Sequence, residues 1–125
     1  MGNRILVDTS ILIDLQKGIE KVINEFKKHK DQVTISNITA CEFIYGSRNS
    51  NEKRINKEFI GKIDILELNE DISKLTYTLL DKYSLKFNLG IADALIASTA
   101  IYNNIPLWTS NKKHFNNITE LKLFK

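Results

Sequence analysis

Hydrophobic and polar residues follow one another in blocks whose spacing predicts strands and helices in alternation. Short apolar runs without a helical period predict buried strands at residues 5–7, 33–35, 63–68, 105–108 and 121–124. Apolar residues recurring every three or four positions predict helices at residues 10–16, 19–30, 37–45, 51–60, 71–85 and 91–102, with a helical turn at 112–116. This alternation is typical of an α/β fold with a mostly parallel sheet covered on both faces.

Length and composition narrow the class of protein. A chain of 125 residues suits one domain, and a domain of that size buries roughly two-thirds of its unfolded surface. With 42% hydrophobic and 26% charged residues, the chain has the profile of a globular protein rather than a disordered one. No apolar run reaches the roughly 18 residues of a membrane helix, and no signal peptide precedes the first strand. We therefore expect a cytoplasmic protein with no membrane partner, spanning residues 1–125 as one domain.

Cysteine and histidine usage excludes several kinds of site. Cys41 is the only cysteine, so no internal disulfide forms, and its apolar helical context predicts a buried, inert thiol. The two histidines, His29 and His114, are far apart, which disfavours a zinc site and a Ser-His-Asp triad. Neither a phosphate-binding glycine loop nor a dinucleotide-binding glycine motif occurs. The net charge of +3 permits a nucleic-acid partner without demanding one.

Four polar residues stand where the pattern predicts buried apolar side chains: Asp8, Glu42, Asp93 and Asn111. A carboxylate in an apolar stripe is costly unless a partner charge or a metal neutralises it. Asp8 ends the first predicted strand and Asn111 follows the fourth. Both therefore fall at the carboxyl ends of parallel strands, where such sheets bind ligands. The pattern predicts one shared cation site.

Each of the four has a structural alternative that the sequence leaves open. Asp8 and Asn111 both suit the position that caps the first turn of a helix. Glu42 matches a capping box with Thr39, although Ser36 or Asn37 is a better cap for that helix. Asp93 would favour the positive end of a helix that starts near residue 91.

The helical stripe that Asp93 shares favours the cation site over that last alternative. The residues on its face are apolar, namely Ile96, Ala97 and Ala100. The wet face of the same helix is expected to carry Ser98, Thr99 and Tyr102. Asp14, by contrast, shares a face with Ser10 and Lys17 and is expected to be a solvated acid.

Oxygen ligands without cysteine or histidine select Mg²⁺ or Mn²⁺ rather than zinc or copper. A carboxylate-held metal activates water and neutralises charge on a phosphodiester under attack. Without metal, three neighbouring carboxylates do not all ionise easily, so at least one should have a raised pKa.

At this point the chain resembles the PIN-domain family, in particular the VapC-type ribonuclease toxins of prokaryotic toxin–antitoxin pairs. Four segments carry the resemblance in order, namely residues 5–10, 39–46, 93–97 and 107–115. The resemblance implies a three-layer α/β/α domain with a five-strand, mostly parallel sheet. It also implies an endoribonuclease that depends on Mg²⁺ or Mn²⁺, forms homodimers and is inhibited by a cognate antitoxin. The expected substrate is RNA, with transfer RNA or another structured RNA as the candidate class.

The resemblance also implies roles for particular residues. Asp8 and Asp93 would be the main metal ligands, and Glu42 would hold or orient the metal-bound water. Asn111 stands where relatives often carry Asp, so its neutral side chain places a second tightly held metal in doubt. The residues expected to bind substrate are Thr9, Ser10, Arg48, Thr109, Lys112 and Lys113, with Lys53, Arg54 and Lys57 next.

Two other functions remain open on the sequence. One is a housekeeping PIN nuclease that processes RNA without an antitoxin, and the other is a catalytically silent RNA-binding scaffold. Three intact acids argue against the scaffold. A neighbouring small antitoxin gene would favour the toxin over the housekeeping nuclease.

Overall fold

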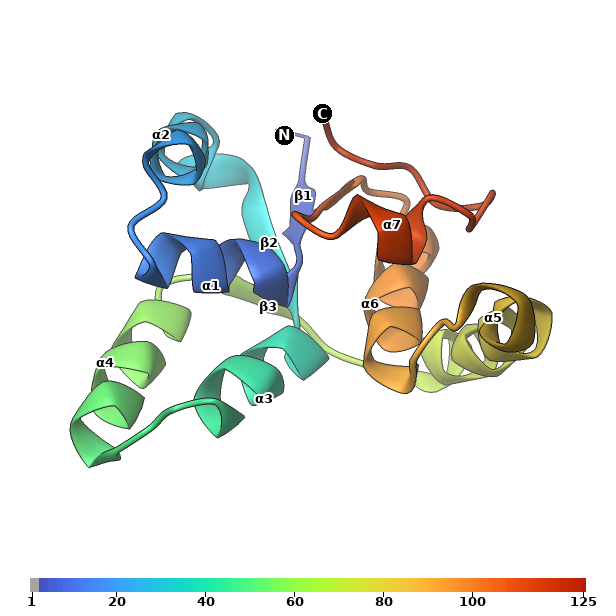
Figure 1. The fold of residues 1–125 in the computed structure, drawn as a ribbon, viewed down its shortest axis with the longest axis horizontal. Coiled ribbons are helices and arrows are strands. Elements are labelled where there is room, and N and C mark those ends of the chain that lie inside the picture. Colours follow the sequence, from blue (N-terminus) through green and yellow to red (C-terminus); the bar gives the residue numbers. More distant parts are fainter. Residues whose placement is uncertain (1–2) are drawn as a thin grey trace.

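The computed structural model describes residues 3–125, in which four strands alternate with seven α-helices (Figure 1). The strands are β1 (Ile5–Val7), β2 (Val33–Ser36), β3 (Asp64–Leu66) and β4 (Leu107–Trp108). The helices are α1 (Thr9–Gln16), α2 (Glu20–Lys28), α3 (Asn37–Tyr45), α4 (Ser50–Ile60), α5 (Glu70–Phe87), α6 (Ile91–Tyr102) and α7 (Lys112–Phe115). No helix among residues 3–125 is both long enough and apolar enough to cross a membrane.

The strands form a parallel sheet in the order β3-β2-β1-β4, which confirms the predicted parallel arrangement. The predicted count of five strands is wrong. The last segment makes a single bridge, Leu123 to Leu107, supported by backbone hydrogen bonds of 2.9 and 2.8 Å. Because β4 is only two residues long, it offers too few partners to extend that bridge into a fifth strand.

Two hydrophobic clusters lie on opposite faces of the sheet, with α1 to α4 on one side and α5 to α7 on the other (Figure 1). Successive side chains of β1 point to opposite faces, so Ile5 and Val7 join one cluster and Leu6 joins the other. On β4, Leu107 and Trp108 divide in the same way. This is the predicted three-layer α/β/α arrangement.

Three predictions about helix faces are wrong. Cys41 is exposed, because α3 buries Thr39, Ala40 and Phe43 instead. The apolar residues of segment 51–60 predict a buried face of Ile55, Phe59 and Ile60, but α4 buries Asn56 and leaves Ile55 49% exposed. Ser98 and Thr99 are fully buried rather than wet. Their hydroxyls stay satisfied because Thr76 donates to Ser98 and Thr99 donates to a carbonyl of its own helix.

Candidate active site

A depression of about 350 Å³ lies at the carboxyl ends of β1 and β4. The structure brings all four predicted catalytic residues, Asp8, Glu42, Asp93 and Asn111, to its lining. Asp14 joins them, so four carboxylates from three helices and one strand end surround the same space. We call this space the acidic depression. Parallel sheets place their ligands at this edge.

Asp8 is held rigidly at the floor of the acidic depression. Its side chain is 4% exposed, and its Oδ2 accepts hydrogen bonds from Ser10 Oγ and Thr109 Oγ1, each 2.7 Å long. Although Asp8 occupies the N-cap position of α1, its carboxylate does not cap the helix. Hydroxyl bonds to an ionised carboxylate are short and strong, so they stabilise the charge and fix its direction. The capping alternative therefore does not account for this residue.

Glu42 lies one turn into α3, and its carboxylate is turned towards α1. Its Oε1 accepts a 2.6 Å hydrogen bond from Thr9 Oγ1. Ser36 caps α3 by accepting from the backbone N–H of Ile38 at 3.2 Å, as the sequence predicted. Thr39 accepts from Thr9 at 3.1 Å and forms no capping box with Glu42. Glu42 therefore does not cap the helix, and it lines the acidic depression.

Asp93 has a raised pKa, caused first by burial and then by the negative charge of Asp8. Glu42 raises the pKa further, while His114 opposes the shift. Nδ1 of His114 lies 3.2 Å from Oδ2 of Asp93, and both side chains are partly exposed. The sequence predicted that at least one of three neighbouring carboxylates would have a raised pKa, and Asp93 is such a carboxylate. A cation in the depression would remove this mutual repulsion.

The sequence analysis did not select His114 or Asp14, both of which line the acidic depression. Asp14 accepts a 2.5 Å hydrogen bond from Ser110 Oγ, and the Ser110 backbone N–H donates to Ser10 Oγ at 3.0 Å. Asp14 is therefore tied to the hydroxyl network around Asp8 rather than simply solvated. A signal was present, because Asp14 lies one helical turn after Ser10 on the same face. His114 follows Asn111 by three positions, which places both on the same face of α7.

Asn111 lines the depression from the start of α7, and its side chain does not cap that helix. Its backbone N–H instead donates to Thr109 Oγ1 at 2.9 Å. Thr109 thereby fixes both Asp8 and the turn that carries Asn111. The capping alternative does not account for Asn111 either.

The bases predicted to hold RNA lie outside the acidic depression. Arg48 pairs with Glu52 through Nε at 3.2 Å and Nη2 at 2.9 Å, and it lines a neighbouring depression. Lys112 lines a separate hollow beside Trp108, and Lys113 is exposed. The outer side of α4 carries Lys53, Arg54 and Lys57. The base that does line the acidic depression is Lys17, which the sequence prediction did not select.

The acidic depression holds four carboxylates against Lys17 and the His114 imidazole. Within residues 3–125, no three acidic, histidine or cysteine side chains approach closely enough to chelate one ion directly. Mg²⁺ usually keeps several of its waters and takes only one or two carboxylates from a protein. The donor set, all oxygen apart from one imidazole, suits such a hydrated hard cation.

Comparisons with known proteins agree with this geometry. The family model described as PIN domain matches residues 5–121. The chain is 38% identical to the ribonuclease VapC1 of Methanocaldococcus jannaschii, over 97% of this chain and 85% of that protein. It is 30% identical to a ribonuclease VapC of Rickettsia bellii, over 95% of this chain and 93% of that protein.

Solved structures with the same fold support the same family. A toxin–antitoxin complex from Klebsiella pneumoniae contains a chain with a TM-score of 0.79 and 28% identity, covering 93% of each chain. VapBC2 of Rickettsia felis, bound to a DNA fragment from its promoter, matches with a TM-score of 0.78 and 27% identity over 96% of each chain. The matched family model, the identity to curated relatives and the shared fold lead to one conclusion: the chain belongs to the PIN domain family.

Proposed function

We propose that this protein is a metal-dependent endoribonuclease that hydrolyses phosphodiester bonds in RNA. One observation carries the proposal: Asp8, Glu42 and Asp93, from segments far apart in the chain, line a single depression. The relatives named as ribonucleases supply the substrate class. An RNA phosphate would be repelled by so many carboxylates unless a cation offset their charge.

The residues that would hold Mg²⁺ or Mn²⁺ are Asp8 and Asp93, with Glu42 at its bound water. When bound, such an ion supplies an activated water and neutralises charge on the phosphate. Both hydrogen bonds to Asp8 end on Oδ2, and among residues 3–125 no side chain binds its Oδ1. That oxygen is therefore the one available to a cation.

Glu42 is the residue suited to take a proton from the attacking water. The hydrogen bond from Thr9 fixes one carboxylate oxygen and leaves the other directed to the depression. A carboxylate within hydrogen-bond reach of a water serves as a general base. Thr9, Ser10 and Thr109 each donate to a carboxylate, so we assign them to positioning these acids rather than to binding the phosphate.

Cleavage of RNA in the presence of Mg²⁺ or Mn²⁺ tests the proposal. Wild-type protein should cut an oligoribonucleotide with either ion and stop on addition of EDTA. Asp93→Asn should abolish cutting while retaining the wild-type circular dichroism spectrum. An Asp93→Asn protein with full activity would overturn the assignment. Loss of cutting without loss of Mn²⁺ binding would separate catalysis from metal capture.

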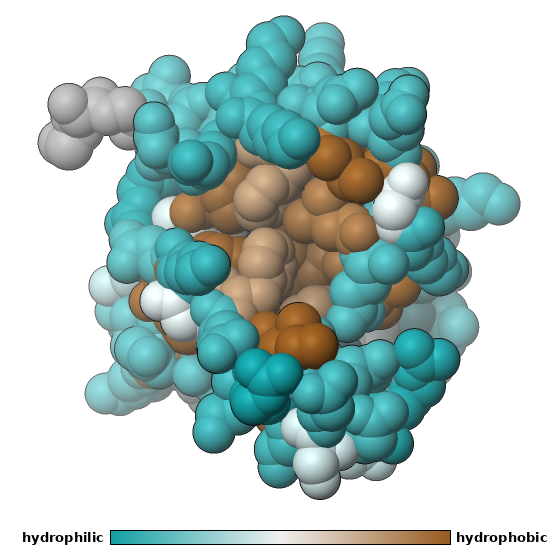
Figure 2. Space-filling model, turned by 90° about the vertical axis from the view of Figure 1, so that its left-hand side faces the viewer, coloured by the Kyte–Doolittle hydropathy of each residue, from teal (hydrophilic) through white to brown (hydrophobic). Residues whose placement is uncertain are grey.

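We further propose that the protein is the toxin of a toxin–antitoxin pair acting in the cytoplasm, where its RNA substrate is made. Similar solved structures are titled toxin–antitoxin complexes, which supports an antitoxin partner. Figure 2 shows hydrophobic residues gathered in a hollow framed by hydrophilic ones, on the side formed by α1 to α4. Pocket walls there include Leu12, Leu15, Phe43, Ile55 and Phe59.

That hollow is the surface we assign to the antitoxin. Co-expression with the product of a neighbouring small gene should relieve growth arrest. Growth arrest that no neighbouring gene relieves would favour a housekeeping nuclease.

We also propose a homodimer. Tyr45 and Ile91, on the neighbouring helices α3 and α6, are 92% and 68% exposed, and this exposure of two large side chains supports a partner surface there. Light scattering should give twice the chain mass, and Tyr45→Lys should halve it. A wild-type monomer at all concentrations would exclude the dimer.

A further inference from the structure

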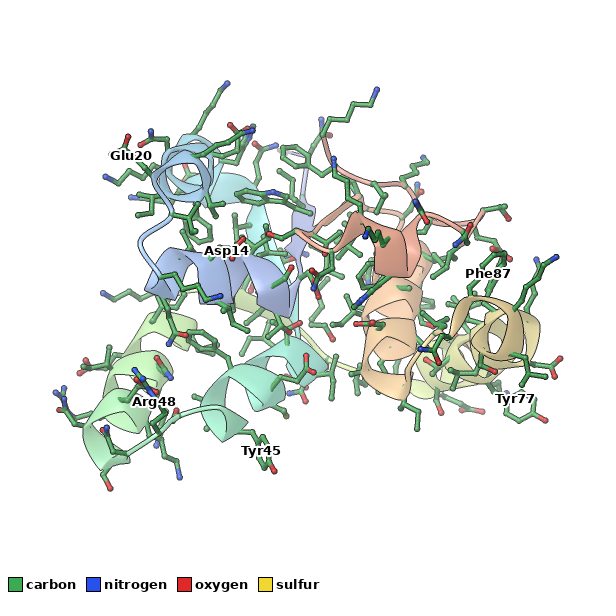
Figure 3. All side chains as sticks on the ribbon, viewed as in Figure 1. Asp14, Glu20, Tyr45, Arg48, Tyr77 and Phe87 are labelled. Atoms are coloured by element: carbon green, nitrogen blue, oxygen red, sulfur yellow. The ribbon has the colours of Figure 1, made fainter. Side chains whose placement is uncertain are left out.

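A second depression, of about 460 Å³, adjoins the acidic one. Ile13 and Lys17 line both depressions. A bound polymer that crosses these two residues would therefore pass from one depression into the other. We call it the amide depression, after Gln16 and Asn56 in its lining. Figure 3 shows that Arg48, which also lines it, lies at α4, near the α1 helix that carries Asp14.

The amide depression contains a polar residue in an unusual place. Asn56 is 4% exposed, although the helical pattern would bury an apolar side chain there. Its Oδ1 accepts from Gln16 Nε2 at 3.0 Å, and its Nδ2 donates to Ser47 Oγ at 2.9 Å. Each amide offers two donors and an acceptor with two lone pairs, so these bonds leave capacity unused on both side chains. The pair presents donors and acceptors side by side.

The rest of the lining combines positive charge with apolar surface. Arg48 is paired with Glu52 through Nε and Nη2, which leaves Lys17 to give the depression a net positive charge. Ile13 and Ile55 are 40% and 49% exposed. Proteins recognise an unstacked RNA base by hydrogen bonds to its edge, and here exposed aliphatic side chains and a cation accompany the amides that could form them.

We propose that the amide depression is a subsite for one nucleotide of the RNA, next to the phosphate that is cut. Gln16 and Asn56 hydrogen-bond the base edge, and Ile13 and Ile55 contact its faces. Lys17 holds the phosphate between the two depressions. The inference rests on the proposed ribonuclease function. An RNA occupant is favoured over an acidic peptide because the amides match base edges and because Lys17 is shared with the acidic depression.

The test follows the side-chain amide signals of Gln16 and Asn56 by NMR. Full-length protein in EDTA is titrated with a random-sequence hexaribonucleotide, so that cleavage does not interfere. Both signals should shift. Ile55→Asp should weaken binding by at least about fivefold, as expected for loss of one base contact. Ile19→Asp is the matched control, because Ile19 is 43% exposed and lines no part of this depression. Both variants should keep the wild-type melting temperature.

Other outcomes distinguish failure of the proposed subsite from failure of the proposed ribonuclease function. Shifts at Asn111 without shifts at Gln16 and Asn56 would overturn the subsite while the ribonuclease proposal stands. Equal weakening by Ile55→Asp and Ile19→Asp would also overturn it. Stronger shifts with an oligoglutamate peptide than with RNA would assign the depression to a protein partner. Failure of wild-type protein to cut RNA with Mn²⁺ would overturn the proposed function itself, whatever the NMR result.

Discussion

The acidic and amide depressions share a border at Ile13 and Lys17 but differ in how they hold their polar groups. In the acidic depression, hydroxyls from β4 and α1 hold the carboxylates, and like charges raise the pKa of Asp93. In the amide depression, Asn56 and Gln16 satisfy one another in part, with no crowding of like charge. Under the proposed function, the first would need a cation before RNA approaches, whereas the second would accept RNA without one. Binding and cutting are assigned to separate surfaces.

Removing an acid should have the largest effect on activity. The size of the loss should distinguish an acid proposed to hold the metal from one that acts through another residue. Asp8→Asn should lower kcat/KM by at least about 100-fold, more than the 10–100-fold typical of outer partners of a metal site. Asp14→Asn should lower it by less than about tenfold, because Asp14 acts through Ser110. Initial rates on a fluorogenic oligoribonucleotide with Mn²⁺ measure both. Equal losses would show that Asp14 is a full member of the catalytic set.

Removing a hydroxyl that holds Asp8 should have the next largest effect on activity. Thr109→Val preserves shape but removes the hydrogen bond to Asp8, so activity should fall by about 10–100-fold. Stability should fall by about 1.5–3 kcal/mol, because the bond reaches a charged group. Thr78→Val is the control, since Thr78 is exposed and donates only to a backbone carbonyl of its own helix. Urea unfolding and kinetics measured together would expose a purely structural effect as a loss of stability alone.

Salt dependence should test the phosphate contact at Lys17, on the border that the two depressions share. Lys17→Ala should weaken RNA binding in EDTA and reduce the slope of log affinity against log salt by about one. Lys53→Ala, on the outer side of α4, should leave that slope unchanged. Fluorescence anisotropy from low to moderate salt measures the slopes. Identical slopes for the two variants would contradict a phosphate contact at Lys17.

The smallest effects concern stability against pH in metal-free protein. The pKa of Asp93 is raised above its usual 3.8, so its stabilising contribution is complete below that pH and is lost as pH rises through the folded-state pKa. A hydrogen bond from Lys82, 3.0 Å long, helps lower the pKa of Glu120 from 4.5 to about 2. The contribution of Glu120 to folding stability is present above pH 4.5 and is lost as pH falls towards 2.

Substitutions at these two acids should therefore act in opposite directions. Asp93→Asn should stabilise the metal-free protein at neutral pH, and Glu120→Gln should destabilise it by less than about 1 kcal/mol, because the ion pair is partly exposed. Urea unfolding in EDTA at several pH values checks the signs. A destabilised Asp93→Asn protein would mean that His114 outweighs the neighbouring acids.

The sequence predicted most of the framework because long apolar periods decide element type. It selected Asp8, Glu42 and Asp93 as candidate site residues because each interrupts an apolar segment, whereas Asn111 was selected mostly on the family resemblance. It failed where tertiary contacts decide the outcome. The last strand depends on the length of its neighbour β4, and the inward face of α4 depends on Gln16 and Ser47, which satisfy Asn56. His114 and Asp14 interrupted no apolar segment, and their contacts with Asp93 and Ser110 become clear only in the folded structure.

The hydrogen bond from Thr109 to Asp8 joins residues 101 positions apart in a chain of 125. During synthesis, Asp8 leaves the ribosome long before Thr109, Asn111 and His114 do. A chain interrupted before residue 109 has its first acids but lacks the hydroxyl that fixes Asp8 and the segment that completes the depression. The proposed nuclease activity therefore arises only after residues 109–114 have been made, and products truncated before them spare the RNA around them.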